Sequence, residues 1–130
     1  MGSEAKEFFE KFKNDTAKMK EQTPDVVSGF LGLFVKVMKD GALPVRGKEL
    51  IALGIGVTQR CAPCIRLHVQ KSLEAGATKE QILEAASVAV MMGGGPAYTH
   101  ISVVMDTPGS IGRLSKYPLE KDRVKWLFSK

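Results

Sequence analysis

Cysteine, histidine and long apolar runs are scarce in this sequence of 130 residues, which contains two cysteines and two histidines. The longest apolar runs, residues 50–57 and 85–92, are far shorter than the roughly 20 residues that a membrane-spanning helix needs. The first residues hold no apolar export signal, and Lys6 does not fit the myristoylation pattern that can follow Gly2. Two cysteines in such a chain also argue against a secreted disulfide scaffold. We therefore expect a cytoplasmic protein without a membrane partner.

The charge is positive overall but is not gathered into a binding surface. A net charge of +5 and a pI near 9.3 bring nucleic acid or another anionic partner into consideration. However, the lysines and arginines are spread along the chain among acidic residues, and aromatic residues do not alternate with them as in a base-stacking surface. We interpret the bases as solvated helix faces and expect no nucleic-acid partner.

The apolar residues recur with helical spacing in almost every segment. Helices are expected over about residues 4–20, 24–40, 46–58, 61–75, 78–92 and 97–105, with a short one over 119–128. Thr78 and Gln81 fit a capping box at the start of the fifth helix, and the run Gly-Gly-Gly-Pro at 93–96 ends that helix. The sequence therefore predicts an all-α fold.

Residues 50–57, Leu-Ile-Ala-Leu-Gly-Ile-Gly-Val, are the ambiguous segment. A run that is apolar on all sides fits either a buried strand or a buried helix. We favour a central buried helix over 46–58, because every flanking segment is helical and no partner strand is visible. Glu49 would then lie in the first turn of this helix.

The length of the chain suits one domain and is too short for two ordinary ones. We predict a single all-α domain over 1–130 with about six to seven helices, one of which begins at the cysteines. Its parts would be N-terminal helices over 4–40, a core over about 43–105 and a C-terminal tail over 110–130.

Both cysteines lie in the sequence Cys61-Ala62-Pro63-Cys64, at the predicted N-terminus of the fourth helix. His68 follows Cys64 by four positions, so Cys61, Cys64 and His68 share one helical face at about 100° per residue. The unpaired N–H groups of a helix start and a nearby imidazole both favour the thiolate, which is the reactive form of cysteine. Glu49 could hold His68 as the third member of a proton relay.

These residues predict a thiol oxidoreductase. A CxxC pair can close a disulfide, so that one cysteine attacks a peroxide or another disulfide and its neighbour resolves the intermediate. Position in the motif favours Cys61 as the more exposed attacker, as in thioredoxin-like sites, whereas the spacing to His68 favours Cys64. The residues leave this choice open.

Other interpretations of the same residues stand beside this one. A zinc-bound structural or interaction module would use Cys61, Cys64, His68 and His100. The cysteines could be inert buried side chains, and Glu49 only a first-turn carboxylate favoured by the helix dipole. Tyr98 and His100 are interpreted as packing or interface residues, with an accessory role at the site as the alternative. We favour a site with no metal and no cofactor.

Over about residues 43–105 the chain resembles the alkylhydroperoxidase D-like, carboxymuconolactone decarboxylase superfamily. The matching pattern is Glu49, the CxxC pair and His68, followed by the junction Ala75-Gly76-Ala77-Thr78 and the break Met-Gly-Gly-Gly-Pro at 92–96. A CxxC pair alone would not be specific, whereas the complete pattern is. The resemblance implies an all-helical fold that assembles as homo-oligomers, either trimers or hexamers.

The resemblance also implies an activity and a role for each residue. Cys64 would attack a hydroperoxide and Cys61 would resolve the intermediate, with Glu49 and His68 as a proton relay. The implied protein is an antioxidant peroxidase that is reduced by a dithiol protein, either lipoyl-bearing or thioredoxin-like. Decarboxylase members lack the cysteine pair, so that activity is not expected. Pro63 stands where some members carry His or Tyr, and this departure predicts weaker peroxide reduction or reduction of protein disulfides instead.

Overall fold

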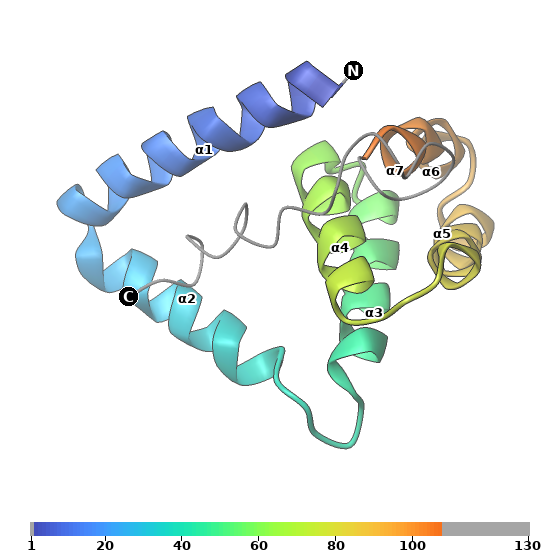
Figure 1. The fold of residues 1–130 in the computed structure, drawn as a ribbon, viewed down its shortest axis with the longest axis horizontal. Helices are drawn as coiled ribbons and strands as arrows, with labels where there is room; N and C mark the ends of the chain where they lie inside the picture. The colour runs from blue at the N-terminus through green and yellow to red at the C-terminus, as the bar shows by residue number, and fades with distance from the viewer. Residues whose placement is uncertain (1, 108–130) are drawn as a thin grey trace. The chain divides into compact units, whose positions relative to one another are not determined.

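A computed structural model describes residues 2–107 of the chain, with side chains from residue 6 onward. The described residues form helices and no strand, which confirms the all-α prediction. The helices are α1 (Gly2–Gln22), α2 (Pro24–Val37), α3 (Val45–Thr58), α4 (Ala62–Glu74), α5 (Lys79–Gly93), α6 (Gly95–Thr99) and α7 (Ile101–Asp106) (Figure 1). The helix predicted over 119–128 and the tail over 110–130 lie outside the described residues.

The last described segment differs from the single helix expected over 97–105. It consists of α6 and α7, which meet at His100. The His100 N–H donates to the carbonyl of Ala97, and Val103 donates to the carbonyl of His100. These bonds span three residues instead of the four of an α-helix, and such tighter turns commonly interrupt helices. The sequence pattern did not reveal this interruption, because the apolar spacing continues through it.

The described residues fall into two compact units. One unit contains α1 and α2 over residues 3–39, and the other contains α3 to α7 over residues 40–107. The expectation of a single domain over 1–130 stays a prediction. The family-specific residues discussed above all lie in the second unit, which we call the α3–α7 unit.

Helices α1 and α2 meet at Thr23, a residue type whose hydroxyl often caps the helix that follows it. The Thr23 hydroxyl instead donates to the carbonyl of Met19 at 2.9 Å, as does its N–H at 2.7 Å, so this residue completes the last turn of α1. Pro24 stands at the start of α2, where the missing N–H removes no helical bond. Phe30 and Leu33 of α2 are largely exposed.

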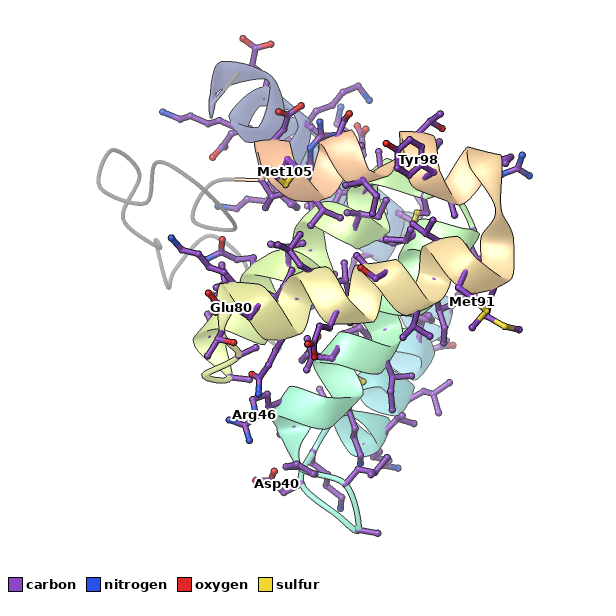
Figure 2. The ribbon with its side chains drawn as sticks, turned by 90° about the vertical axis from the view of Figure 1, so that its right-hand side faces the viewer. Asp40, Arg46, Glu80, Met91, Tyr98 and Met105 are labelled. Atoms are coloured by element: carbon purple, nitrogen blue, oxygen red, sulfur yellow. A yellow bond between two sulfur atoms is a disulfide. The ribbon has the colours of Figure 1, made fainter. Side chains whose placement is uncertain are left out.

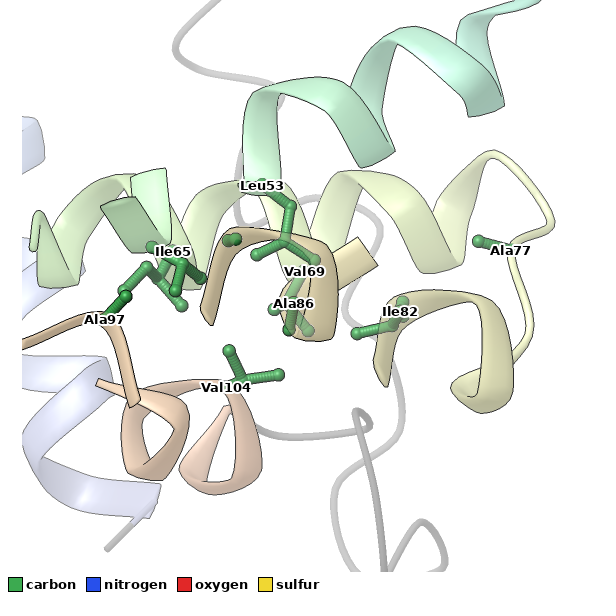
Figure 3. Close-up of a cluster of buried hydrophobic side chains, with 10 residues drawn as sticks. Leu53, Ile65, Val69, Ala77, Ile82, Ala86, Ala97 and Val104 are labelled. Carbon is green, nitrogen blue, oxygen red and sulfur yellow. The ribbon is translucent and has the colours of Figure 1, made fainter. Parts of the chain in front are cut away.

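Helix α3 is the central element of the α3–α7 unit. It packs against α4 and α5 along its length and also contacts α6, while α7 packs on α4. Figure 3 shows the buried core that these helices share. Its members are Leu53, Val57, Ile65, Val69, Ala77, Ile82, Ala86, Ala89, Ala97 and Val104. The alanines of α5 are short, which lets the backbone of α5 lie close to α3.

One face of α3 remains exposed in the single chain, although its residues 50–57 are apolar on all sides. Leu53 and Val57 are fully buried, whereas Ile51 and Ile55 are 52% and 56% exposed. Helices α4 and α5 cover the sides of α3 that carry Leu53 and Val57, and neither covers the side that carries the two isoleucines. An apolar helix face left open to water costs free energy, because apolar area gains stability only when it is removed from water.

The two ends of α5 are set by the residues that the sequence predicted. The Thr78 hydroxyl accepts the N–H of Gln81 at 3.1 Å, and the Gln81 side chain accepts the N–H of Thr78 at 3.0 Å, which confirms the capping box. At the other end Gly94 has φ +73° and ψ −153°, a backbone conformation that residues with a Cβ rarely adopt. Gly94 therefore allows the chain to turn from α5 into α6.

None of the helices within residues 2–107 combines the length and the apolar character that crossing a bilayer would require.

Candidate active site

Cys61 and Cys64 form a disulfide at the N-terminus of α4, where the sequence placed them. Cys61 is the N-cap residue, and its sulfur accepts the N–H of Cys64 at 3.3 Å. Pro63 lies in the first turn of α4, where its missing N–H leaves no carbonyl unpaired. The sulfur of Cys61 therefore occupies the place of an N-cap oxygen, where the partial positive charge of the helix end favours a negative ligand.

The turn that leads into the cysteines is a Schellman motif at the end of α3. Cys61 donates its N–H to the carbonyl of Gly56 at 3.0 Å, and Arg60 donates to the carbonyl of Val57 at 3.1 Å. Arg60 has φ +56°, in the left-handed region where glycine usually stands in this motif. A non-glycine residue in this conformation next to a candidate site is the kind of local strain that often accompanies function.

Glu49 and His68 form a buried pair between α3 and α4. The Oε2 atom of Glu49 lies 2.7 Å from Nδ1 of His68, and Glu49 is only 3% exposed. Because an ionised carboxylate can only accept a hydrogen bond, we assign the ring hydrogen to Nδ1. The pair connects the two helices that carry the candidate site, across 19 positions of sequence.

The position of Glu49 within α3 differs from the expected one, and the difference changes which group stabilises its carboxylate. Helix α3 begins at Val45, so Glu49 lies beyond its first turn. The interpretation of Glu49 as a first-turn carboxylate favoured by the helix dipole is therefore wrong, because that effect fades beyond the first turn. The pairing with His68 is what compensates the burial of this carboxylate.

Both predicted accessory residues lie on or beside α6. Tyr98 is 68% exposed, and the Nδ1 atom of His100 lies 2.8 Å from the carbonyl oxygen of Pro96. Within residues 2–107 no three His, Cys, Asp or Glu side chains are arranged to hold a metal ion. The structure thus brings Cys61 to Cys64 and Glu49 to His68, and it pairs His100 within its own segment.

Gly56 and Arg60 were not singled out from the sequence, although Gly56 contacts Cys64 and Arg60 forms the turn directly before Cys61. A Cβ built on Gly56 would lie 3.3 Å from the Cβ of Cys64, which is closer than most such contacts. The sequence signal for Gly56 is its place with Gly54 inside an apolar run, which permits close packing but does not identify the partner. For Arg60 no sequence signal exists, because a positive φ follows from the turn.

Comparison with known proteins decides the family. A model of the carboxymuconolactone decarboxylase family matches residues 24–106, a span that runs from α2 to α7. The chain belongs to this family. Among carboxymuconolactone decarboxylase family structures, one from Legionella pneumophila superposes with a TM-score of 0.74 at 34% identity, covering 77% of this chain and 89% of the other. This confirms the family resemblance that the sequence predicted.

Further proteins resemble the chain to different degrees. A family structure from Thermotoga maritima, suggested to take part in an antioxidative response, has a TM-score of 0.66 and 29% identity, covering 72% of this chain and 80% of its own. An uncharacterised protein of Cupriavidus necator is 37% identical over 79 residues, which are 61% of this chain and 70% of that protein. Uncharacterised protein 4 in the cox locus of Paracoccus denitrificans is 46% identical over 71 residues, 55% of this chain and 64% of that protein.

Proposed function

We propose that the protein is a thiol-dependent peroxidase that reduces hydroperoxides through a dithiol–disulfide cycle of Cys64 and Cys61. The observation that carries this proposal is the buried Glu49–His68 pair, whose imidazole is on the same helix as the cysteine disulfide. A buried acid–base pair one helical turn from a cysteine is an arrangement that can move the thiol proton. The Thermotoga maritima relative, which is suggested to act in an antioxidative response, also supports a redox function.

In the proposed cycle Cys64 attacks first. Its thiolate attacks the terminal oxygen of the hydroperoxide, so that an S–O bond forms and the O–O bond breaks, and the alkoxide takes the proton that His68 removed from Cys64 and leaves as the alcohol. The thiolate of Cys61 then attacks the sulfur of the Cys64 sulfenic acid, and the oxygen leaves as water. The products are an alcohol, water and the Cys61–Cys64 disulfide.

Their places in α4 support these roles for the two cysteines. Cys64 precedes His68 by one turn on the same helical face, so the imidazole is the base suited to take the Cys64 proton, directly or through water. With Nδ1 of His68 on Glu49, that exchange would use Nε2. Cys61 instead has its sulfur on the Cys64 N–H, and this bond stabilises negative charge on Cys61.

A dithiol protein, lipoyl-bearing or thioredoxin-like, would return the site to the reduced state. One thiolate of the partner attacks the sulfur of Cys64, the Cys61–Cys64 bond breaks, and Cys61 leaves as a thiolate stabilised by its hydrogen bond. The partner's second thiol then attacks the mixed disulfide. This step releases Cys64 as a thiol and leaves a disulfide within the partner. Two electrons and two protons pass from the partner to the peroxide in each cycle.

We further propose that the working form is a homo-oligomer, a trimer or a hexamer. Large apolar side chains remain exposed on α3 and α5, including Ile51, Ile55 and Met91, the last of which is 72% exposed. Figure 2 shows Met91 pointing away from the ribbon. A single soluble chain rarely leaves so many large apolar side chains in water unless they meet a partner.

The direct test of the proposed function is a thiol titration with intact-mass measurement on reduced, metal-stripped protein, before and after one equivalent of an organic hydroperoxide. We expect rapid loss of both thiols and a mass lower by two hydrogens. Unchanged thiols after prolonged exposure would contradict a peroxidase. A parallel insulin-reduction assay separates peroxide reduction from the reduction of protein disulfides that Pro63 favours.

A further inference from the structure

Both cysteines contact one residue of α3, Gly56, through different atoms. The carbonyl oxygen of Gly56 accepts the N–H of Cys61 at 3.0 Å. On its Cα side, the space that a Cβ would fill is bounded by the Cβ of Cys64 at 3.3 Å, the backbone nitrogen of Ile65 at 3.4 Å and the carbonyl carbon of Cys64 at 3.5 Å. Gly56 is buried, so neither contact is loosened by solvent.

From these contacts we infer that Gly56 is a positioning residue that sets the dithiol–disulfide equilibrium of the Cys61–Cys64 pair, an inference that rests on the proposed redox function. The carbonyl of Gly56 holds the backbone of Cys61, and its missing side chain sets how closely Cys64 can approach. A disulfide requires the Cβ atoms of its two residues to stand at about 3.5–4.5 Å from each other. Gly56 therefore controls the distance on which bond formation depends.

The effect of a side chain at this position differs between the two redox states. In the disulfide form a closed path runs from the Gly56 carbonyl through Cys61 and the S–S bond to Cys64 and back to the Cα of Gly56. A methyl group on residue 56 would press on Cys64, which the S–S bond prevents from moving away from Cys61. In the dithiol form that path is open, and the start of α4 can shift by a few tenths of an ångström. A side chain at residue 56 therefore disfavours the disulfide more than the dithiol.

The chain offers a matched control in Gly54, two residues earlier on α3. A Cβ on Gly54 would meet its nearest neighbour, the carbonyl oxygen of Ala85, at 3.7 Å, which is an ordinary contact. Gly54→Ala and Gly56→Ala raise the helix propensity of α3 equally. A difference between the two variants thus reports the contact with Cys64.

The experiment measures the equilibrium of the full chain with glutathione, in which the protein dithiol and oxidised glutathione give the protein disulfide and two reduced glutathiones. We expect Gly56→Ala to lower the equilibrium constant for disulfide formation about tenfold, which is about 30 mV for this two-electron couple. Gly54→Ala should stay within about twofold of the natural protein. A folded Gly56→Ala protein with an unchanged constant, or an equal shift in Gly54→Ala, would overturn the inference.

A second measurement separates positioning from simple packing. The loss of stability caused by Gly56→Ala is compared in the oxidised protein and in a Cys61→Ser, Cys64→Ser background, which keeps both Cβ atoms but forms no disulfide. We expect a smaller loss in the double-serine background. Equal losses, or failure of Gly56→Ala to fold in both, would show a packing residue and overturn the inference. Because glutathione exchange needs no peroxide, a shifted equilibrium without peroxide reduction would contradict only the proposed function.

Discussion

The Oε2 atom of Glu49 on α3 lies 2.7 Å from the Nδ1 atom of His68 on α4, and both side chains are largely buried. Removing one partner of such a pair leaves a buried polar group without its hydrogen bond, at a cost of about 1–3 kcal/mol or more. The pair therefore contributes to the packing of α3 on α4 as well as to the proposed proton transfer, and a test must separate these contributions.

Glu49→Gln makes that separation, because glutamine has a similar shape and its oxygen can still accept the Nδ1 hydrogen of His68. We expect the variant to remain folded, while peroxide-dependent disulfide formation slows by about 10²-fold, within the range for loss of general acid–base catalysis. Stopped-flow detection of thiol loss gives the rate, and circular dichroism monitors folding. Glu84→Gln, an exposed position on α5, is the matched control. An unchanged rate in Glu49→Gln would remove Glu49 from the relay.

Replacing each cysteine in turn tests which one attacks. Cys64→Ser should abolish reaction with hydroperoxide, because the thiol beside His68 is lost. Cys61→Ser should still react once and stop at the sulfenic acid on Cys64, which a sulfenic-acid reagent labels for mass spectrometry. A monothiol should form a stable mixed disulfide with Cys64 in this variant, because neither Cys61 nor a second thiol of the reductant is present to resolve it. Labelling of Cys61 in Cys64→Ser would instead assign the attack to Cys61.

Ser72 on α4 is fully buried, and its hydroxyl has no hydrogen-bond partner among the described residues. A buried hydroxyl without a partner costs free energy, and alanine is the better helix former. Ser72→Ala should therefore raise the free energy of unfolding by about 1 kcal/mol, measured by urea denaturation. Ser87→Ala is the control, because the exposed Ser87 hydroxyl donates to the carbonyl of Leu83. Destabilisation by Ser72→Ala would mean that the hydroxyl has a partner after all.

Gly94→Ala tests the turn between α5 and α6. Because the φ of +73° at Gly94 is unfavourable for residues with a Cβ, we expect a loss of about 1–3 kcal/mol in unfolding free energy. Gly95→Ala serves as the control, since a Cβ there would meet nothing within 4 Å. Thermal unfolding followed by circular dichroism compares the two. Equal stability of the two variants would show that the positive φ at residue 94 does not require glycine.

Charged substitutions on the exposed apolar faces test the proposed oligomer. Ile55→Lys on α3 or Met91→Lys on α5 should shift the mass measured by light scattering toward the single chain, because a lysine buried in an apolar interface loses its hydration. Glu84→Lys, also exposed on α5, should leave the mass unchanged. A natural protein that is already a single chain at micromolar concentration would contradict the proposal.

Much of the secondary structure could be predicted from local sequence, because its causes are local. The capping box of Thr78 and Gln81 and the glycine-rich end of α5 act over a few residues, and the structure confirms both. The break at His100 between α6 and α7 was missed, since the apolar spacing runs through it without a proline or glycine. The cysteines at the start of α4 were placed correctly, because helical spacing and Pro63 both indicate a first turn.

By itself the sequence determined an all-α chain, a CxxC pair at a helix N-terminus and a histidine one turn further along. The tertiary structure decided which distant groups meet: Glu49 with His68, and Gly56 with both cysteines. It also decided that α3 buries Leu53 but exposes Ile55 in the single chain. The physical reason is that helix spacing depends on neighbours along the chain, whereas these contacts depend on how α3 and α4 pack side by side.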